Sequence, residues 1–221
     1  MIFRLTSDPD LLPLPSLGEP NGLIAVGGDL SPRRLIVAYL YGFFPWYGFK
    51  EEDEILWWCP QQRFVIFPDE IHISHTMRQL MRRETYTVTM NKAFDRVIEA
   101  CSEADGRKAL EGAWLGEDMI EAYKSMHRIG HAKSVEVWNK AGELVGGLYG
   151  LKIGICETFF GESMFSREPN ASKLALIHLA QSMQGSCGVI DCQFETPHLK
   201  SMGGRTIPYA EYMEILKRHT P

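Results

Sequence analysis

The stretch that most constrains the fold of this chain is residues 159–173, a strand-like run that leads into a helix start. Residues 159–166 read FFGESMFS and alternate bulky and small side chains, as a buried strand does. Glu162 lies inside this apolar run, and a buried carboxylate is costly unless a cation or hydrogen-bond donors reach it. The sequence therefore predicts either an edge-strand position for Glu162 or a site built around it.

The turn that follows, residues 166–173, has the character of an anion site. Asn170 or Ser172 is available as the N-cap of the next helix. Free N–H groups and the positive end of the dipole at a helix N-terminus suit a phosphate or carboxylate. An ordinary capped helix explains the same residues equally well, so both interpretations stay open at this point.

Charge and apolar runs limit the classes of partner. The 221 residues carry a formal net charge of −5, with 45% hydrophobic and 23% charged residues. This balance argues against a general nucleic-acid coat or a membrane-surface binder, and a polyanionic partner would need a local basic patch. Residues 1–15 lack the pattern of a signal peptide. The apolar run 35–49 is broken by Gly42 and Pro45 and is too short to span a bilayer.

The cysteines point to a reducing compartment. They are odd in number and form no C-x-x-C pair: Cys59, Cys101, Cys156, Cys187 and Cys192. This pattern indicates reduced thiols and neither a disulfide framework nor a zinc site. We therefore expect a cytoplasmic protein without a bound metal.

The element order predicts an α+β protein with a mixed sheet flanked by helices. Two aromatic clusters, residues 43–47 and 56–60, end a less regular first part, so we predict a small N-terminal domain over 1–60 and a larger domain over 61–221. A helix from about Ser74 carries Arg78, Arg82 and Arg83 on roughly one face, which is either a solvated face or a basic patch. Residues 188–194 read as a strand, which would put Asp191 and Gln193 on one face.

This order is similar to that of the GCN5-related N-acetyltransferases (GNAT fold). Those enzymes hold the pyrophosphate of coenzyme A on a glycine-bearing loop at the start of a helix. The corresponding turn here, residues 166–173, contains no glycine. The omission weighs against coenzyme A as the donor.

Several motifs together resemble one family, the bacterial leucyl/phenylalanyl-tRNA–protein transferases. They follow the family's order over nearly the whole chain, at residues 19–23, 27–30, 44–46, 55–58, 146–150, 161–166, 170–173 and 190–193. The resemblance implies a small N-terminal domain on a GNAT-like catalytic domain. It implies transfer of Leu, Phe or sometimes Met from aminoacyl-tRNA to an N-terminal Lys or Arg of an acceptor protein. The product carries an N-degron of the N-end rule and is marked for degradation.

The chemistry of such a transfer suits the residues. An aminoacyl ester is already activated, so no cofactor is expected. A peptide α-amine has an ordinary pKa of about 8 and must be held, deprotonated and oriented. Holding two substrates in a near-attack pose supplies about 7–11 kcal/mol. Glu162 and Asp191 would attract the two positive charges of the acceptor, and Gln193 would hydrogen-bond the attacking amine. Whether Asp191 and Gln193 remove the proton or only orient the amine, while a ribose hydroxyl relays it, stays open.

The resemblance also implies binding residues. The aminoacyl pocket would be lined by Leu148, Met164, Leu179, Met183 and Ile190. Trp46 and Trp114 would surround the terminal adenosine, and Arg82 and Arg83 would contact the acceptor stem. The tRNA terminal phosphate would bind at Asn170, Ser172 and Lys173.

Departures from the family leave the substrate preference open. Residues 146–150 read Gly-Gly-Leu-Tyr-Gly where better-known members have Met in the third position, and Leu179 and Met183 replace bulkier aromatics. One methylene changes discrimination by only about 1–3 kcal/mol, so Leu, Phe and Met are not ranked. Two other functions stay in view: a CoA-dependent N-acyltransferase of the same fold, and a non-catalytic adaptor for N-terminal Arg or Lys. Nothing in the sequence demands more than a monomer.

Overall fold

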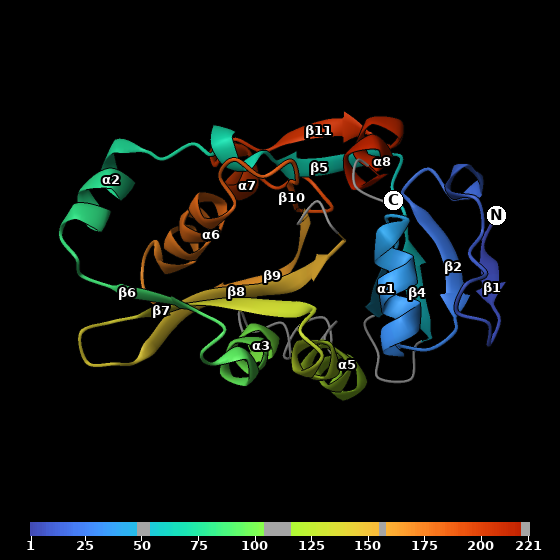
Figure 1. Ribbon diagram of the computed structural model, residues 1–221, viewed down its shortest axis with the longest axis horizontal. Coiled ribbons are helices and arrows are strands. Elements are labelled where there is room, and N and C mark those ends of the chain that lie inside the picture. The colour runs from blue at the N-terminus through green and yellow to red at the C-terminus, as the bar shows by residue number, and fades with distance from the viewer. Residues whose placement is uncertain (48–53, 104–115, 155–157, 218–221) are drawn as a thin grey trace.

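The computed structural model describes residues 1–47, 54–103, 116–154 and 158–217. A four-stranded sheet occupies one end of the molecule (Figure 1), in the strand order β1-β2-β4-β3. Its strands are β1 (Phe3–Leu5), β2 (Leu23–Gly27), β3 (Phe44–Tyr47) and β4 (Ile55–Trp58). The chain also forms a short 3-10 turn, η1 (Pro15–Leu17), and α1 (Pro32–Leu40), which packs beside this sheet.

Helix α1 has residues typical of helix ends at both of its ends. The Ser31 hydroxyl accepts the N–H of Arg34, and Pro32 is the first helical residue. Gly42 follows the helix with a φ of +78°, a conformation that glycine adopts without strain. The face that includes Leu35, Ala38 and Tyr39 is buried.

A seven-stranded sheet forms the rest of the frame, in the order β11-β5-β10-β9-β8-β7-β6. Strand β10 is parallel to β9, and the other neighbours are antiparallel, so the sheet is mixed. The α+β prediction is confirmed. The strands are β5 (Gln62–Ile66), β6 (Thr87–Met90), β7 (Ala132–Trp138), β8 (Leu144–Ile153), β9 (Thr158–Ser166), β10 (Ile190–Asp191) and β11 (Arg205–Pro208).

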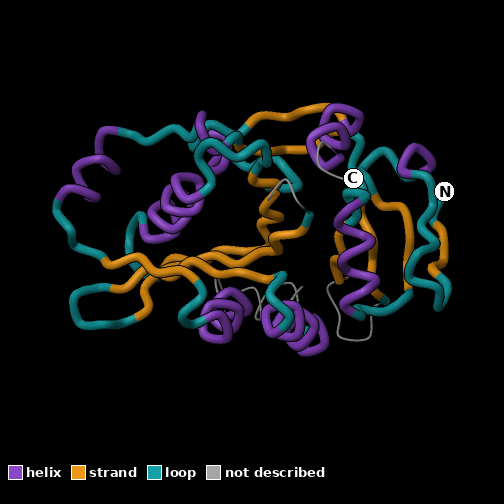
Figure 2. Tube along the Cα trace, viewed as in Figure 1, coloured by secondary structure: helices purple, strands orange, loops and turns teal. Residues whose placement is uncertain are grey.

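Helices cover both faces of the central strands. Figure 1 shows α3 (Phe94–Glu103) and α5 (Glu117–Arg128) against one face of β7 and β8, and α6 (Ala171–Ser182) against the other. The remaining elements are η2 (Pro68–Glu70), α2 (His75–Arg82), α7 (Pro197–Ser201) and α8 (Tyr209–Lys217). Figure 2 shows the helix over residues 75–82 at the end of the molecule opposite the N-terminus.

Close backbone approach explains a glycine in β8. A Cβ at Gly146 would lie 2.5 Å from the Cβ of Ala171, the first residue of α6. Only glycine lets the helix pack this tightly on the strand.

The strand predicted over residues 188–194 is shorter in the structure. Strand β10 covers only Ile190–Asp191, and Gln193 has a φ of +62°. The Asp191 Oδ1 atom accepts the backbone N–H of Gln193 at 2.9 Å, which turns the chain out of the pleat. The two residues therefore do not share a face through strand periodicity, and that inference was wrong.

The division of the chain near Pro60 stays a prediction. The two sheets use separate segments, residues 3–58 and 62–208. One continuous hydrophobic cluster nevertheless joins them, because it contains Leu5 and Trp57 of the first sheet together with Val65 and Leu151 of the second.

Candidate active site

The Glu162 carboxyl lies at the meeting point of three helices or strands. Strand β9 carries Glu162, whose Oε1 accepts the hydroxyl of Tyr39 from α1 at 2.7 Å. Its Oε2 accepts the hydroxyl of Tyr123 from α5 at 2.8 Å. The side-chain amide of Gln193 donates to Oε1 at 3.2 Å. The isolated carboxylate of the sequence thus meets hydrogen-bond donors, as its burial requires.

Burial raises the pKa of Glu162 to about 7. Taken as two independent donors to the ionised form, the hydroxyls of Tyr39 and Tyr123 would oppose this shift. Burial, followed by the negative charge of Glu162, raises the pKa of both tyrosines well above the usual value. The tyrosines are therefore neutral donors near pH 7, whereas Glu162 titrates there. The Glu162 residue keeps part of its surface open, although its carboxyl is enclosed.

Asp191 lies in a different, fully buried cluster. Arg63 from β5 donates to Asp191 through Nε at 2.8 Å and through Nη2 at 2.7 Å, in a two-pronged ion pair. The hydroxyl of Tyr212 from α8 donates to the same carboxylate at 2.7 Å. Burial alone would lower the pKa of Arg63, but the charge of Asp191 outweighs it and raises the pKa. Arg63 therefore stays charged.

Gln193 links the two clusters. Its backbone N–H donates to Asp191 Oδ1, and its side-chain amide donates to Glu162 Oε1. Asp191 therefore acts on Gln193 through the backbone and holds it in a left-handed conformation. The family resemblance assigned Asp191, Gln193 and Glu162 to one site. In the structure, these two hydrogen bonds of Gln193 connect the three residues.

Two cavities open beside this network. The larger has a volume of about 310 Å³, lies among β8, β9, β10 and α7, and is mostly apolar. The smaller has a volume of about 250 Å³ and includes Phe44, Trp46 and Phe194 in its wall. Both cavities are lined by Glu162, Ser163, Cys192, Gln193, Thr196 and Leu199. The polar network is thus the wall that two separate ligand groups would share.

Four of the five residues expected around an apolar side chain line the larger cavity. These are Leu148, Met164, Leu179 and Ile190. Met183 is buried in the hydrophobic cluster behind it and is not part of the lining. The cavity wall also includes Phe159 and Leu176.

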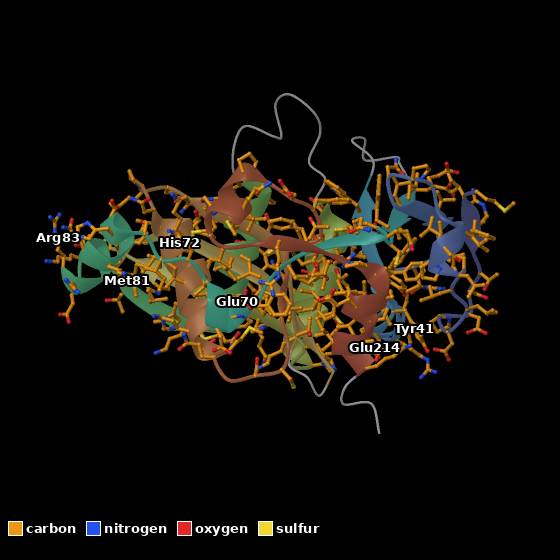
Figure 3. The ribbon with its side chains drawn as sticks, turned by 90° about the horizontal axis from the view of Figure 1, so that it is seen from above. Tyr41, Glu70, His72, Met81, Arg83 and Glu214 are labelled. Carbon is orange, nitrogen blue, oxygen red and sulfur yellow. The ribbon has the colours of Figure 1, made fainter. Side chains whose placement is uncertain are left out.

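The residues expected to contact tRNA lie in several places. Trp46 lines the smaller cavity, with ring centroids 5.9 Å from Trp58 and 6.0 Å from Phe194. Trp114 lies outside the described residues. Arg82 and Arg83 are exposed at the end of α2, and Figure 3 shows Arg83 projecting from the end of the molecule.

The turn before α6 differs in detail from the expected cap. Asn170 occupies the N-cap position, but its side chain makes no capping bond. The Ser166 hydroxyl accepts the N–H of Ser172 instead, at 3.2 Å. His198 lines the larger cavity. Burial lowers the pKa of His198, and the positive charge of Lys173 in the first turn of α6 lowers it further, so Lys173 lies near this cavity.

Sequence reasoning missed the residues that hold the carboxylates. None of Arg63, Tyr123 and Tyr212 is among the residues to which the sequence pointed. A tyrosine on an otherwise apolar buried face was the available signal, because a buried hydroxyl usually needs a partner. Arg63 gave no such signal, since arginine at the start of a strand is commonly exposed.

Several other chemistries find little support at this site. Burial raises the pKa of the Cys192 thiol far above its usual value, which makes it a poor nucleophile near neutral pH. Within the described residues no cluster of three or more His, Cys, Asp or Glu side chains has the geometry to hold a metal ion.

None of the helices in those residues combines the length and apolar character that a bilayer crossing needs.

Comparisons with known proteins agree on one family. The family model described as leucyl/phenylalanyl-tRNA protein transferase matches residues 65–217, and the model of its N-terminal domain matches residues 28–61. The chain is 51% identical over 209 residues to the leucyl/phenylalanyl-tRNA–protein transferase of Syntrophus aciditrophicus, covering 94% of this chain and 85% of the relative. It is 48% identical over 222 residues to that of Nitrosomonas eutropha, covering 100% and 92%.

Solved structures show more distant similarity. The structure of L-PGS from Bacillus licheniformis aligns with a TM-score of 0.41 at 14% identity, over 79% of this chain and 54% of that chain. A GCN5-related N-acetyltransferase from Sphaerobacter thermophilus aligns with a TM-score of 0.37 at 15% identity, over 87% and 60%. The sequence matches, in contrast, are close and span the chain from end to end. This chain therefore belongs to the leucyl/phenylalanyl-tRNA–protein transferase family and is an aminoacyltransferase.

Proposed function

We propose that this enzyme moves Leu, Phe or Met from aminoacyl-tRNA to the α-amine of an N-terminal Lys or Arg of an acceptor protein. The observation that carries the proposal is the shared wall of the two cavities, which contains Glu162 and Gln193. One cavity would take the aminoacyl side chain and the other the adenosine or the acceptor. The ester carbonyl and the attacking amine would then meet at the shared wall.

The larger cavity suits an apolar aminoacyl side chain. Leu148, Met164, Leu179 and Ile190 provide an apolar wall, and its volume of about 310 Å³ is in the lower part of the range for small-ligand sites. Met183 would act from behind by supporting this wall. Apolar contacts discriminate weakly, so a preference among Leu, Phe and Met is a matter for measurement.

Trp46 is the candidate for stacking on the terminal adenosine. It lines the smaller cavity, and base–aromatic stacking contributes roughly 1–3 kcal/mol per base. Trp114 is proposed for the same role by family resemblance alone. Asn170, Ser172 and Lys173 would receive the terminal phosphate, which the proximity of Lys173 to the cavity supports.

The acceptor would be bound through charge and then attack as an amine. An N-terminal Arg or Lys carries two nearby cations, and Glu162 is the acidic group that both cavities expose. Gln193 would hydrogen-bond and orient the α-amine. Asp191, whose charge Arg63 balances, is proposed to position Gln193 and not to contact the acceptor. The activated ester makes a cofactor unnecessary. We place the enzyme in the cytoplasm as a monomer, and its products in the N-end rule degradation pathway.

A donor assay tests the proposal. The protein is incubated with an Arg-initiated peptide and either labelled Leu-tRNA or labelled acetyl-CoA. Transfer from Leu-tRNA to the Arg peptide, and not to the same peptide with N-terminal Asp, is expected. Transfer from acetyl-CoA alone would identify a CoA-dependent acyltransferase, and peptide binding without turnover would identify an adaptor. Either result would overturn the proposal.

A salt titration tests the tRNA contacts. Arg82→Glu with Arg83→Glu should weaken aminoacyl-tRNA binding and flatten its salt dependence, because fewer counterions are released on binding. The matched control reverses two other exposed charges, Arg33→Glu and Arg128→Glu. An unchanged slope in the first variant would return Arg82 and Arg83 to an ordinary solvated face.

A further inference from the structure

The two tyrosines at Glu162 also touch each other, and this closes a ring of three groups. The hydroxyl oxygens of Tyr39 and Tyr123 are 2.6 Å apart. Each hydroxyl is also in hydrogen-bond contact with one oxygen of Glu162, at 2.7 Å and 2.8 Å. All three separations are those of O–H···O hydrogen bonds.

A count of protons shows what this ring requires. With Glu162 ionised, the ring contains two protons, one on each tyrosine, for three contacts. Whichever way the hydroxyls turn, two oxygens then face each other with lone pairs alone. With Glu162 protonated there are three protons for three contacts, and each group donates once and accepts once. The protonated form satisfies the whole ring.

We infer that Glu162 carries a proton in the empty site, held by Tyr39 and Tyr123 as positioning residues, and releases it when the cationic N-terminus of an acceptor binds. The first half concerns the free protein, and the second half rests on the proposed function. The balance is simple: the Glu162 carboxylic acid and an ammonium ligand give a carboxylate–ammonium pair and one proton, which passes to the solvent. No other bond forms or breaks in this step.

The surroundings of Glu162 agree with a neutral resting state. Burial favours the uncharged acid most strongly, and the nearby Asp191 carboxylate adds to this effect. The tyrosine hydroxyls, as donors to the ionised form, and Arg63 oppose it, and the net effect is a raised pKa. Because Arg63 and Asp191 form one ion pair, their influences on Glu162 largely cancel. Tyr149 from β8 also faces the group, and its own pKa is raised by burial and by Glu162. It is neutral near pH 7.

A bound acceptor would favour the ionised form of Glu162 over the protonated form. A cation within about 4–6 Å lowers the pKa of a carboxyl by roughly 1–3 units. Gln193 already donates to Oε1 and would stabilise the ionised form further. The site would therefore hold a full negative charge only when a cation is present to balance it. Acceptor binding should weaken as pH falls below the midpoint of Glu162, since the proton must then be displaced.

The free protein provides the first test. Side-chain carboxyl ¹³C shifts are followed from about pH 5 to pH 9, with Glu162 assigned by the signal lost in Glu162→Gln. We expect a midpoint near 7 in the absence of any substrate. A Glu162 signal that is already that of a carboxylate at about pH 5.5 would overturn the inference, whatever the transfer assay shows.

Tyr39→Phe tests the ring itself, with Tyr41→Phe as the control because Tyr41 is exposed just beyond the same helix. Two independent donors to a carboxylate would each lower its pKa, so removal of one would raise the midpoint. In the closed ring Tyr39 contacts both Tyr123 and Glu162. Every contact of the ring has a proton only when Glu162 is protonated, so the complete ring favours the protonated form. We therefore expect Tyr39→Phe to lower the midpoint and Tyr41→Phe to leave it unchanged. A rise with Tyr39→Phe would overturn the ring.

Proton release is measured by calorimetric titration of an Arg-initiated peptide, without tRNA, in two buffers of different ionisation enthalpy. At about pH 6 we expect roughly 0.4 to 0.9 protons released per bound peptide, and none for Glu162→Gln. Equal values for the two proteins would overturn the binding-linked half. If the peptide is not an acceptor in the donor assay but Glu162 still titrates near 7, the proposed function fails while the protonated resting state stands.

Discussion

Two buried carboxylates on neighbouring strands have opposite surroundings. Asp191 on β10 is paired in register with Phe160 on β9, two residues before Glu162. Asp191 meets the guanidinium of Arg63, whereas the described partners of Glu162 are two hydroxyls and an amide. A carboxylate with its own cation is already neutralised and serves the fold. A carboxyl group held only by neutral donors can stay protonated at rest and become charged when a cationic ligand binds.

The largest expected effect is on the Asp191 cluster. Asp191→Asn leaves the guanidinium of Arg63 buried without its counter-ion, and breaking a buried pair in this way costs about 3–5 kcal/mol. Urea unfolding at pH 7 measures the free energy of unfolding. The control is Glu70→Gln, which removes the exposed partner of Arg205 and should leave the free energy of unfolding almost unchanged. If Asp191→Asn and Glu70→Gln lowered the free energy of unfolding by similar amounts, the buried ion pair would be no more important for the fold than an exposed one.

A double variant sharpens the same point. Arg63→Met with Asp191→Leu removes both charges together, and apolar replacement of a buried pair is often neutral or stabilising. We expect it to recover most of the stability lost in Asp191→Asn. Transfer activity should remain low, because the backbone N–H of Gln193 has lost its acceptor. Recovery of both stability and the rate of transfer would show that Asp191 does not position Gln193.

The next effect concerns Glu162 and depends on pH. Its pKa is raised from 4.5 to about 7 in the folded protein, so its contribution to stability is fully present below about pH 4.5 and is lost as pH rises through 7. Glutamine does not titrate, so Glu162→Gln does not lose this contribution. Its free energy of unfolding relative to that of the wild type should therefore increase by on the order of 2–3 kcal/mol from about pH 5 to pH 8. Thermal unfolding across this range measures the difference. In the same variant the KM for the acceptor should rise while aminoacyl-tRNA binding is retained.

A pH-independent difference between Glu162→Gln and the wild type would show that Glu162 titrates normally. Glu162 and Asp191 would then differ in their neighbours but not in how burial affects their ionisation. An unchanged acceptor KM together with an unchanged rate would remove Glu162 from the site.

The smallest effect is expected from Tyr212→Phe. This change removes one of the donors to Asp191 and leaves the ion pair with Arg63 in place. A hydrogen bond to a charged group contributes about 1.5–3 kcal/mol, and we expect a loss near the lower value because the guanidinium remains. A loss as large as that of Asp191→Asn, measured in the same urea series, would mean that the hydroxyl and not the cation stabilises Asp191.

Much of the local structure followed from local pattern. Ser31 and Pro32 are residue types that favour a helix start and they do start α1, and the buried faces of α3 and α5 follow their apolar spacing. The prediction for residues 188–194 was wrong because alternation alone does not reveal a side chain that bonds its own backbone, as Asp191 does with Gln193. The roles of the site residues remain predictions, although the structure gathers Glu162, Gln193 and four of the five apolar residues around shared cavities.

The sequence by itself determined the strand that carries Glu162 and the need for partners at that position, because periodicity and the cost of burying a charge are local properties. It also determined the family, through motifs that span the chain. Only the tertiary structure decided which partners arrive. Tyr39 is 123 residues from Glu162, and Arg63 is 128 residues from Asp191. Nothing local encodes that a helix brings a neutral hydroxyl to one carboxylate while a strand brings a cation to the other, because that choice depends on how helices and strands pack.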